Sequence, residues 1–193
     1  MRITAADKAE TRKRIISAAK ALFRTKGFDS ATTRDISKAV GIATGTMFNY
    51  FPSKEAIVVE LASQSLEKAE AEFAKSRRKG APLEETLFAS VAAQLRSMRP
   101  LRKYIRPLLE TALSPAAPKD DAEASLRTGL NEHFAGILRE HGVSDPSPVQ
   151  LNIFWSLYVG VLSSWGTDKS PKQEDTLALL DQSICMYVDW LNA

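Results

Sequence analysis

Apolar residues recur at spacings of three and four along almost the whole chain, whereas alternation at every second residue is nearly absent. This periodicity is typical of amphipathic α-helices and gives no reason to expect strands. With 193 residues, 44% of them hydrophobic, the chain can bury a sizeable core in one or two small domains. We therefore predict an all-α protein of about nine helices.

Near the N-terminus the pattern predicts one long helix followed by two short ones. The long helix covers about residues 9–26. Thr32 and Asp35 have the spacing of a capping box, with Asp in place of the usual Glu, and start a short helix that stops at Gly41. The next helix covers about residues 44–50. Two short helices joined by a tight glycine turn and packed on a longer one form a helix-turn-helix.

The third helix carries side chains that suit the major groove of DNA. Thr44, Gly45 and Thr46 occupy its first turn and are small enough to let the backbone approach base edges. The threonines also supply hydroxyls and a methyl group that can touch thymine. The alternative is a purely structural helical hairpin in which these polar residues occur by chance.

The charge distribution favours the DNA-binding interpretation. Residues 1–54 contain 11 lysines and arginines against 4 aspartates and glutamates, a net charge of +7, and residues 55–193 have a net charge of −4. A local excess of positive charge attracts phosphates. Asn49 and Tyr50 can reach phosphates beside the helix over 44–50. Pro52-Ser53 opens a fourth, long helix, and Lys54 adds a positive charge in its first turn.

Residues 11–61 resemble the N-terminal domain of the TetR family of transcriptional repressors, through TRKRIISAAKALFRTKGF and then TTRDISKAVGIATGTMFNYFPSKEAI. Ala43 stands where the family often has a capping Ser or Thr, and Phe48 where a Tyr is frequent. Both departures concern the operator sequence more than the fold. The resemblance implies base contacts by Arg34, Thr44, Gly45 and Thr46, and contacts to the DNA backbone by Thr33, Asn49, Tyr50 and Lys54.

The chain is expected to divide into a DNA-binding domain, residues 8–68, and a helical effector-binding and dimerisation domain, residues 69–193. The basic run at 77–80 and the following Ala81-Pro82 mark the place where the apolar pattern lapses. Beyond it, helices are predicted over 83–98, over 101–113, from about Leu126 to His141, over 149–165 and over 173–191, with a loop at 114–121.

A homodimer is implied by the same resemblance, because family members dimerise through their last two helices. The last predicted helix has a continuous apolar stripe, and the one before it repeats small residues every four positions, which would let a partner backbone come close. The alternative is packing within the chain's own core. The candidate interface consists of Ser156, Gly160, Ser164, Leu177, Leu180, Ile184, Tyr187 and Val188.

An unknown small-molecule effector is a further partner that the resemblance implies. Aromatic residues with occasional polar tips are typical of apolar ligand sites, although most such residues are ordinary core. The candidate pocket residues are Phe88, Leu95, Tyr104, Leu108, Phe134, Phe154, Trp155 and Tyr158.

Other classes of site find little support in the sequence. His133 and His141 have no Cys, Asp or Glu cluster at metal-ligand spacing, so neither a metal nor another cofactor is expected. Cys185 lies in an apolar helical pattern that favours a small buried side chain. No apolar run reaches the length of a membrane span, and a cytoplasmic protein is expected.

These features together predict a dimeric DNA-binding regulator, a repressor that a small effector releases from a palindromic operator. The main rival is a helical ligand-binding or scaffold protein that keeps the motif without regulating transcription. An enzyme is the weakest alternative, because no catalytic triad, carboxylate pair or phosphate-binding loop occurs at a usable spacing.

Overall fold

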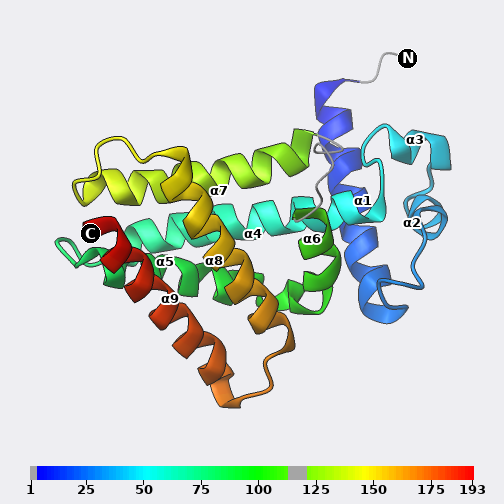
Figure 1. The fold of residues 1–193 in the computed structure, drawn as a ribbon. Coiled ribbons are helices and arrows are strands. Elements are labelled where there is room, and N and C mark those ends of the chain that lie inside the picture. Colours follow the sequence, from blue (N-terminus) through cyan, green and yellow to red (C-terminus); the bar gives the residue numbers. More distant parts are fainter. Residues whose placement is uncertain (1–3, 113–120) are drawn as a thin grey trace. The chain divides into compact units, whose positions relative to one another are not determined.

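The computed structural model describes residues 4–112 and 121–193, and within these ranges the chain is helical without strands (Figure 1). The predicted all-α class is therefore confirmed. The chain forms two compact units that divide between Leu61 and Ala62, inside one helix, and each unit is described by itself. The domain boundary expected after residue 68 falls in the same helix.

The first unit contains three complete helices and the start of a fourth. They are α1 (Ala5–Thr25), α2 (Thr33–Val40), α3 (Thr44–Phe48) and α4 (Lys54–Ser76).

Local signals explain where these helices begin and end. Thr4 and Asp7 form a capping box that starts α1 four residues earlier than the apolar pattern suggests. Thr32 and Asp35 form the predicted capping box of α2. Gly41 follows α2 with a φ of 76°, and the amide of Ile42 donates to the carbonyl of Ser37 over 3.0 Å. This left-handed glycine ending turns the chain sharply into α3.

The core of the first unit joins α1, α2 and α3 with the segment after α3. Its buried side chains include Ile15, Ala19, Phe23, Ile36, Val40, Met47, Phe51 and Ile57. Arg12 reinforces this packing from α1. Its guanidinium donates to the carbonyl of Tyr50 over 3.0 Å, pairs with Glu60 at 2.7 Å and lies over the ring of Phe51. The end of α3 and the start of α4 are thereby tied to α1.

The second unit holds the remainder of α4 and the helices that follow. They are α5 (Leu83–Met98), the 3₁₀ helix η1 (Arg99–Tyr104), α6 (Ile105–Ala112), α7 (Asp121–Glu140), α8 (Pro148–Thr167), the short 3₁₀ helix η2 (Pro171–Gln173) and α9 (Glu174–Asn192).

Two prolines explain the structure of the segment after α5, where the sequence predicts a helix over 101–113 that is kinked at Pro107. Pro100 lies in the first turn of η1, and Pro107 lies in the first turn of α6. Both positions suit proline, because the first amides of a helix have no intrahelical partner. The segment is therefore split into η1 and α6. Most of the predicted loop at 114–121 lies outside the described residues.

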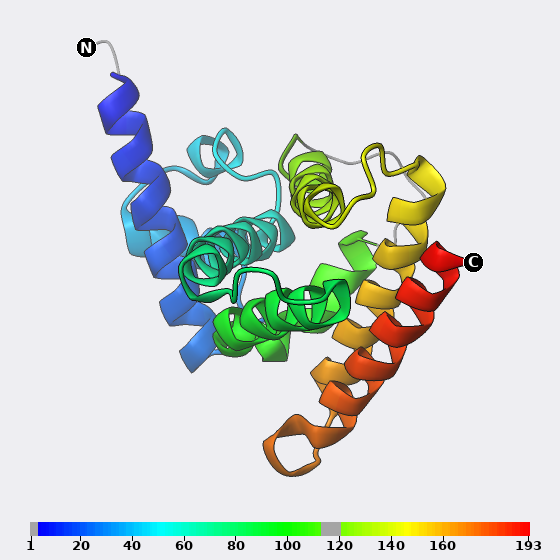
Figure 2. The ribbon, with the colours of Figure 1, turned by 90° about the vertical axis from the view of Figure 1, so that its left-hand side faces the viewer.

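Helices α8 and α9 run antiparallel, side by side, and both views show this pair (Figures 1 and 2). At one end the Tyr187 hydroxyl donates to the carbonyl of Gln150 over 3.1 Å. The rings of Phe134, Phe154 and Tyr187 join α7, α8 and α9, with centroid separations of 4.3 Å and 5.1 Å. This aromatic series forms the centre of the second core.

One glycine permits a close helix contact in this unit. A Cβ atom at Gly166 would lie 2.3 Å from Cγ2 of Ile105, so only glycine fits where α8 meets the start of α6. Larger side chains at this position would push the two helices apart.

Part of the predicted dimer interface lies inside the protomer. Leu180, Ile184, Tyr187 and Val188 of α9 are buried within the chain's own core. They are therefore not accessible to a second copy, and their apolar stripe is explained by packing within the chain. Ser156 and Gly160 are exposed, and Ser164 and Leu177 are half-buried.

Candidate nucleic-acid interface

The two faces of α3 differ sharply in burial. Met47 is fully buried and holds the helix against α2, where its sulfur accepts from the hydroxyl of Ser37 at 3.4 Å. Gly45 and Thr46 lie exposed in the same short helix, and Thr44 is half-buried. The three small residues predicted to touch bases therefore share the first turn of α3, with two of them free to meet a groove.

Helix α2 contributes Thr33 and Arg34 in its first turn. Thr33 is half-buried, whereas Arg34 is exposed and has no ion pair among the described residues. The neighbouring Asp35 is already occupied. Hydrogen bonds from the Lys26 ammonium and from Thr32 hold its pKa well below the usual range for a carboxyl group. Its negative charge therefore serves the helix N-terminus rather than the guanidinium of Arg34.

Lys54 takes a position that the sequence did not predict. Its ammonium donates to the carbonyls of Phe28, Asp29 and Ala31 at 2.7, 3.2 and 3.2 Å, and it lies 4.4 Å from the Phe28 ring centroid. The three N–H donors are thus satisfied by the segment between α1 and α2. A contact of Lys54 with DNA phosphate stays a prediction.

The other two predicted backbone contacts lie at the end of α3. Asn49 is the exposed residue that closes this helix, and Tyr50 is half-buried just beyond it. Arg12 holds the Tyr50 carbonyl, which fixes the backbone of this segment. Both side chains therefore project from a braced part of the chain.

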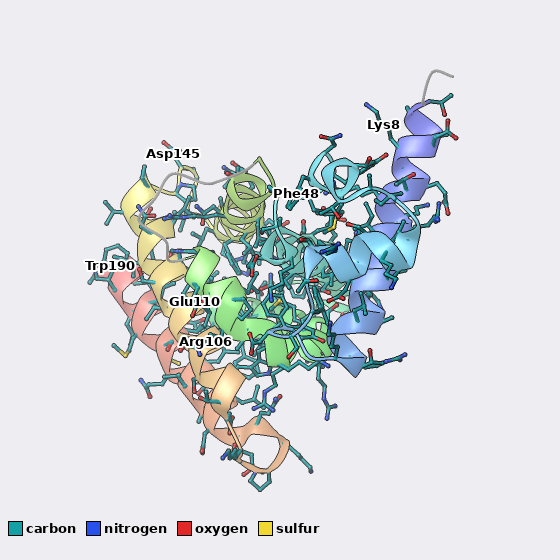
Figure 3. The ribbon with its side chains drawn as sticks, turned by 90° about the vertical axis from the view of Figure 1, so that its right-hand side faces the viewer. Lys8, Phe48, Arg106, Glu110, Asp145 and Trp190 are labelled. Atoms are coloured by element: carbon teal, nitrogen blue, oxygen red, sulfur yellow. The ribbon has the colours of Figure 1, made fainter. Side chains whose placement is uncertain are left out.

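Phe48, noted in the sequence only as a departure from a frequent Tyr, is a further candidate contact. It is a large aromatic side chain on α3, and 48% of its surface is exposed (Figure 3). Its position one turn beyond Gly45 was a usable signal, because residues three apart share a helix face. An exposed ring there can touch the thymine methyl group.

The predicted pocket residues gather in the second unit, mostly as buried core. Seven of the eight are buried, and Phe88 is half-buried. Phe154 and Tyr158 line a small cavity of about 10 Å³ between α5, α8 and α9, which is no larger than the space one water needs. Phe134 and Trp155 pack against this pair of rings, whereas Leu95 lines a different cleft.

Unpaired polar groups lie deep in the same unit. Gln94 is 1% exposed, and neither its amide oxygen nor its amide nitrogen has a hydrogen-bond partner among the described residues. The Tyr158 hydroxyl is likewise buried without a partner. Such groups cost about 1–3 kcal/mol each when left unpaired. Each of these groups would gain a hydrogen-bond partner if a small polar molecule reached it.

A second polar cluster involves α4, α5 and α7. The Ser90 hydroxyl lies 2.7 Å from Nε2 of His133, and Glu70 lies 3.8 Å from the other ring nitrogen. Burial lowers the pKa of His133 and raises the pKa of Glu70.

Gln94 is not among the pocket residues predicted from the sequence, although Ser90 and Gln94 are polar residues four apart within an apolar pattern.

Comparison with known proteins connects the first unit with a family. The profile described as "Bacterial regulatory proteins, tetR family" matches residues 15–61. The repressor KstR of Mycobacterium tuberculosis is 29% identical over 184 residues, which cover 93% of this chain and 81% of KstR. The crystal structure of Thermus thermophilus FadR, a TetR-family repressor in complex with lauroyl-CoA, has a TM-score of 0.73 and 26% identity over 92% of this chain and 93% of that one. Residues 15–61 form a domain of the TetR family.

Within the TetR family, similarity is concentrated in the N-terminal part. The regulator UidR of Escherichia coli K12 is 41% identical over 63 residues, and this match spans only about a third of either chain, 33% of this one and 32% of UidR. A TetR regulator from Rhodococcus sp. RHA1 has a TM-score of 0.73 at 15% identity, which shows a shared fold alone. Sequence identity is thus highest in the N-terminal part, whereas weaker similarity extends over nearly the whole chain.

Two structural findings bear on other kinds of site. None of the helices in the described residues has both the length and the apolar character needed to cross a membrane. Within the same residues, no three His, Cys, Asp or Glu side chains are grouped so that they could hold a metal ion.

Proposed function

We propose that this TetR-family protein is a dimeric transcriptional repressor that binds a near-palindromic operator through α3. The observation that carries the proposal is the two-sided burial of α3, with Met47 fully buried and Gly45 and Thr46 exposed. A helix anchored in this way can enter a major groove without rearranging the core. Arg34 and Phe48, both exposed nearby in the chain, extend the surface that meets the bases.

The proposed dimer face lies on α8 and α9, opposite their buried sides. Large apolar side chains remain exposed there, including Met186 at 60% and Trp190 at 45%, which is labelled at the end of α9 (Figure 3). Exposed apolar groups of this size favour an interface between protein chains. The face consists of Val149, Ser156, Gly160, Leu179, Met186 and Trp190.

We further propose that a small molecule releases the repressor by entering the second unit. The unpaired groups of Gln94 and Tyr158 support such a site, because a ligand with a hydroxyl or carbonyl group would satisfy them. The complex of Thermus thermophilus FadR with lauroyl-CoA adds support from a similar fold. Release follows only if the ligand prefers the protein state that binds DNA weakly.

Fluorescence anisotropy with DNA from the region beside the protein's own gene tests the proposal. We expect one fragment to bind far more tightly than a shuffled fragment of the same length, and unlabelled specific DNA to compete for it. Equal affinity for all fragments would favour the rival ligand-binding or scaffold function. Addition of lauroyl-CoA to the bound complex then tests one candidate for release.

A further inference from the structure

A basic cleft of about 480 Å³ opens in the second unit between the end of α5, η1 and the start of α9. This volume is in the range of sites for small organic ligands. Four cationic side chains line the cleft, and the residues that line it include no Asp or Glu. They are Arg96, Arg99, Arg102 and Lys172. The cleft is therefore a concave, positively charged site within a unit that the proposed DNA reading does not use.

The floor of the cleft is apolar. Ala92, Leu95, Trp165 and Leu177 line it, and the first three are buried. The indole N–H of Trp165 is buried without a hydrogen-bond partner in the described part of the chain. An apolar floor under a basic rim suits a molecule that has both an apolar part and an anionic group.

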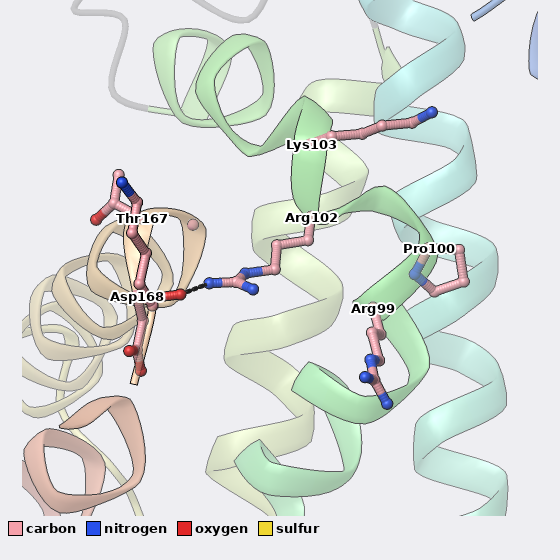
Figure 4. Close-up of a pocket in the computed structure, with 8 residues that line it drawn as sticks. Arg99, Pro100, Arg102, Lys103, Thr167 and Asp168 are labelled. Carbon is pink, nitrogen blue, oxygen red and sulfur yellow. Dashed lines mark hydrogen bonds between the residues drawn. The ribbon is translucent and has the colours of Figure 1, made fainter. Parts of the chain in front are cut away.

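One of the four cations is held in place, and the others remain available. Arg102 donates through Nε to the Trp165 carbonyl over 2.6 Å and through Nη2 to the Asp168 carbonyl. Figure 4 shows the Arg102 side chain in a neighbouring hollow. Arg99 and Arg102 line both this hollow and the cleft. Arg96, Arg99 and Lys172 have no carboxylate partner among the described residues. Their positive charges are thus not neutralised within the protein.

The backbone brings Lys172 to the rim at some cost. Lys172 and Gln173 are the two non-glycine residues with positive φ in the described chain, at 53° and 64°. Such backbone conformations are strained for residues other than glycine and persist where the surrounding structure requires them. Both residues line the cleft together with Arg99 and Arg102.

We propose that this cleft binds an organic phosphate with an apolar group. The phosphate would lie between Arg99, Arg102 and Lys172, and the apolar group against Leu95, Trp165 and Leu177. Guanidinium groups suit phosphate because their N–H donors match its oxygens in pairs. The proposal can be tested independently of DNA binding, because binding to the cleft can be measured on the protein without DNA.

Isothermal titration of the full chain with octyl phosphate, inorganic phosphate and octanol tests the proposal without any variant. We expect octyl phosphate to bind more tightly than inorganic phosphate. Its affinity should fall as sodium chloride is added. Octanol should bind much more weakly. Absence of octyl phosphate binding, or equal binding of octanol, overturns the proposal, and equal binding of inorganic phosphate overturns the role of the apolar floor.

Charge-removing variants locate the site. Replacing both cations in Arg99→Gln/Lys172→Gln should weaken octyl phosphate binding by about tenfold or more, since two charge-assisted hydrogen bonds are lost. The control Arg106→Gln removes an exposed cation outside the cleft, where the guanidinium pairs with Glu110, and should change the affinity by less than about twofold. If the double variant keeps its octyl phosphate affinity but binds DNA more weakly, the cleft contacts DNA phosphates and the proposal is wrong.

Discussion

The ammonium of Lys54 lies 2.7 Å from the carbonyl oxygen of Phe28, so the first residue of α4 is joined to the chain just after α1. Two more carbonyls, those of Asp29 and Ala31, share the same ammonium. The lysine predicted to contact DNA phosphate is therefore an internal clamp of the first unit.

Lys54→Met should lower the free energy of unfolding by about 1–3 kcal/mol, because three backbone carbonyls lose their donor. Denaturant unfolding measures this change, with Lys38→Met as a control that removes an exposed lysine. If Lys54 also contacts phosphate, the variant lowers affinity for all DNA sequences and flattens the salt dependence by about one unit of slope. Unchanged stability would contradict the clamp.

Arg34→Ala should relax sequence preference at one base pair of each half-site by about 1–3 kcal/mol, because an arginine can donate two hydrogen bonds to guanine. Competition binding with operator variants measures the preference. Lys38→Ala removes a charge from the same helix and is expected to leave the preference intact. Equal weakening at every site would instead assign Arg34 to the DNA backbone.

Trp190→Glu should split the proposed dimer without unfolding the chain, because this side chain is 45% exposed in the single protomer. Light scattering measures the mass, and circular dichroism checks the fold. A change at the buried Ile184 would be uninformative, since Ile184→Glu places a charge in the core and unfolds the chain. A wild-type monomer that still binds a palindrome tightly would rule out the dimer face.

The stability of the second unit should fall as the pH drops below about 6.5, the ordinary pKa of histidine. Burial lowers the pKa of His133 in the folded chain. As the pH falls, the unfolded chain therefore binds a proton before the folded chain does, and the free energy of unfolding decreases. For one proton the slope is at most about 1.4 kcal/mol per pH unit. His133→Gln should have a shallower dependence in unfolding measured from about pH 5.5 to 7.5. Identical slopes would exclude His133 as the cause. The carboxylates that act on His133, those of Glu70 and Glu140, are present in both proteins.

Gly166→Ala should destabilise the chain by about 1–3 kcal/mol, because its methyl group would overlap Ile105. The matched control is Gly129→Ala in α7, where no atom lies within 4 Å of the added carbon. That change should instead stabilise the helix by up to about 1 kcal/mol. Thermal unfolding of the two variants measures the contrast, and equal effects would contradict the close approach.

Local signals in the sequence were sufficient for much of the fold. The limits of α5 agree with the apolar pattern, and the capping box at Thr32 and the turn at Gly41 lie where predicted. These features depend on residues close together in the chain, so a sequence reveals them. The same locality explains why the exposed face of α3 could be anticipated from three small residues in one turn.

Features that depend on tertiary packing were not predictable in the same way. The apolar stripe of α9 gave no indication that Ile184 and Tyr187 face α5 and α8 of the same chain rather than a partner. Lys54 could not be assigned to carbonyls more than twenty residues earlier, because nothing local links them. The basic cleft likewise combines cations from α5, η1 and η2, which are separated in sequence.

The carboxylate of Asp168 accepts hydrogen bonds from the amides and hydroxyls of both Ser170 and Thr176, and these bonds hold its pKa well below the usual range for a carboxyl group. One side chain therefore joins the end of α8 to the first turn of α9. We expect related chains to differ in the residues of this connection but not in its length. An inserted residue would separate the Asp168 carboxylate from Ser170 or from Thr176. Among related chains, insertions here should occur together with loss of the aspartate.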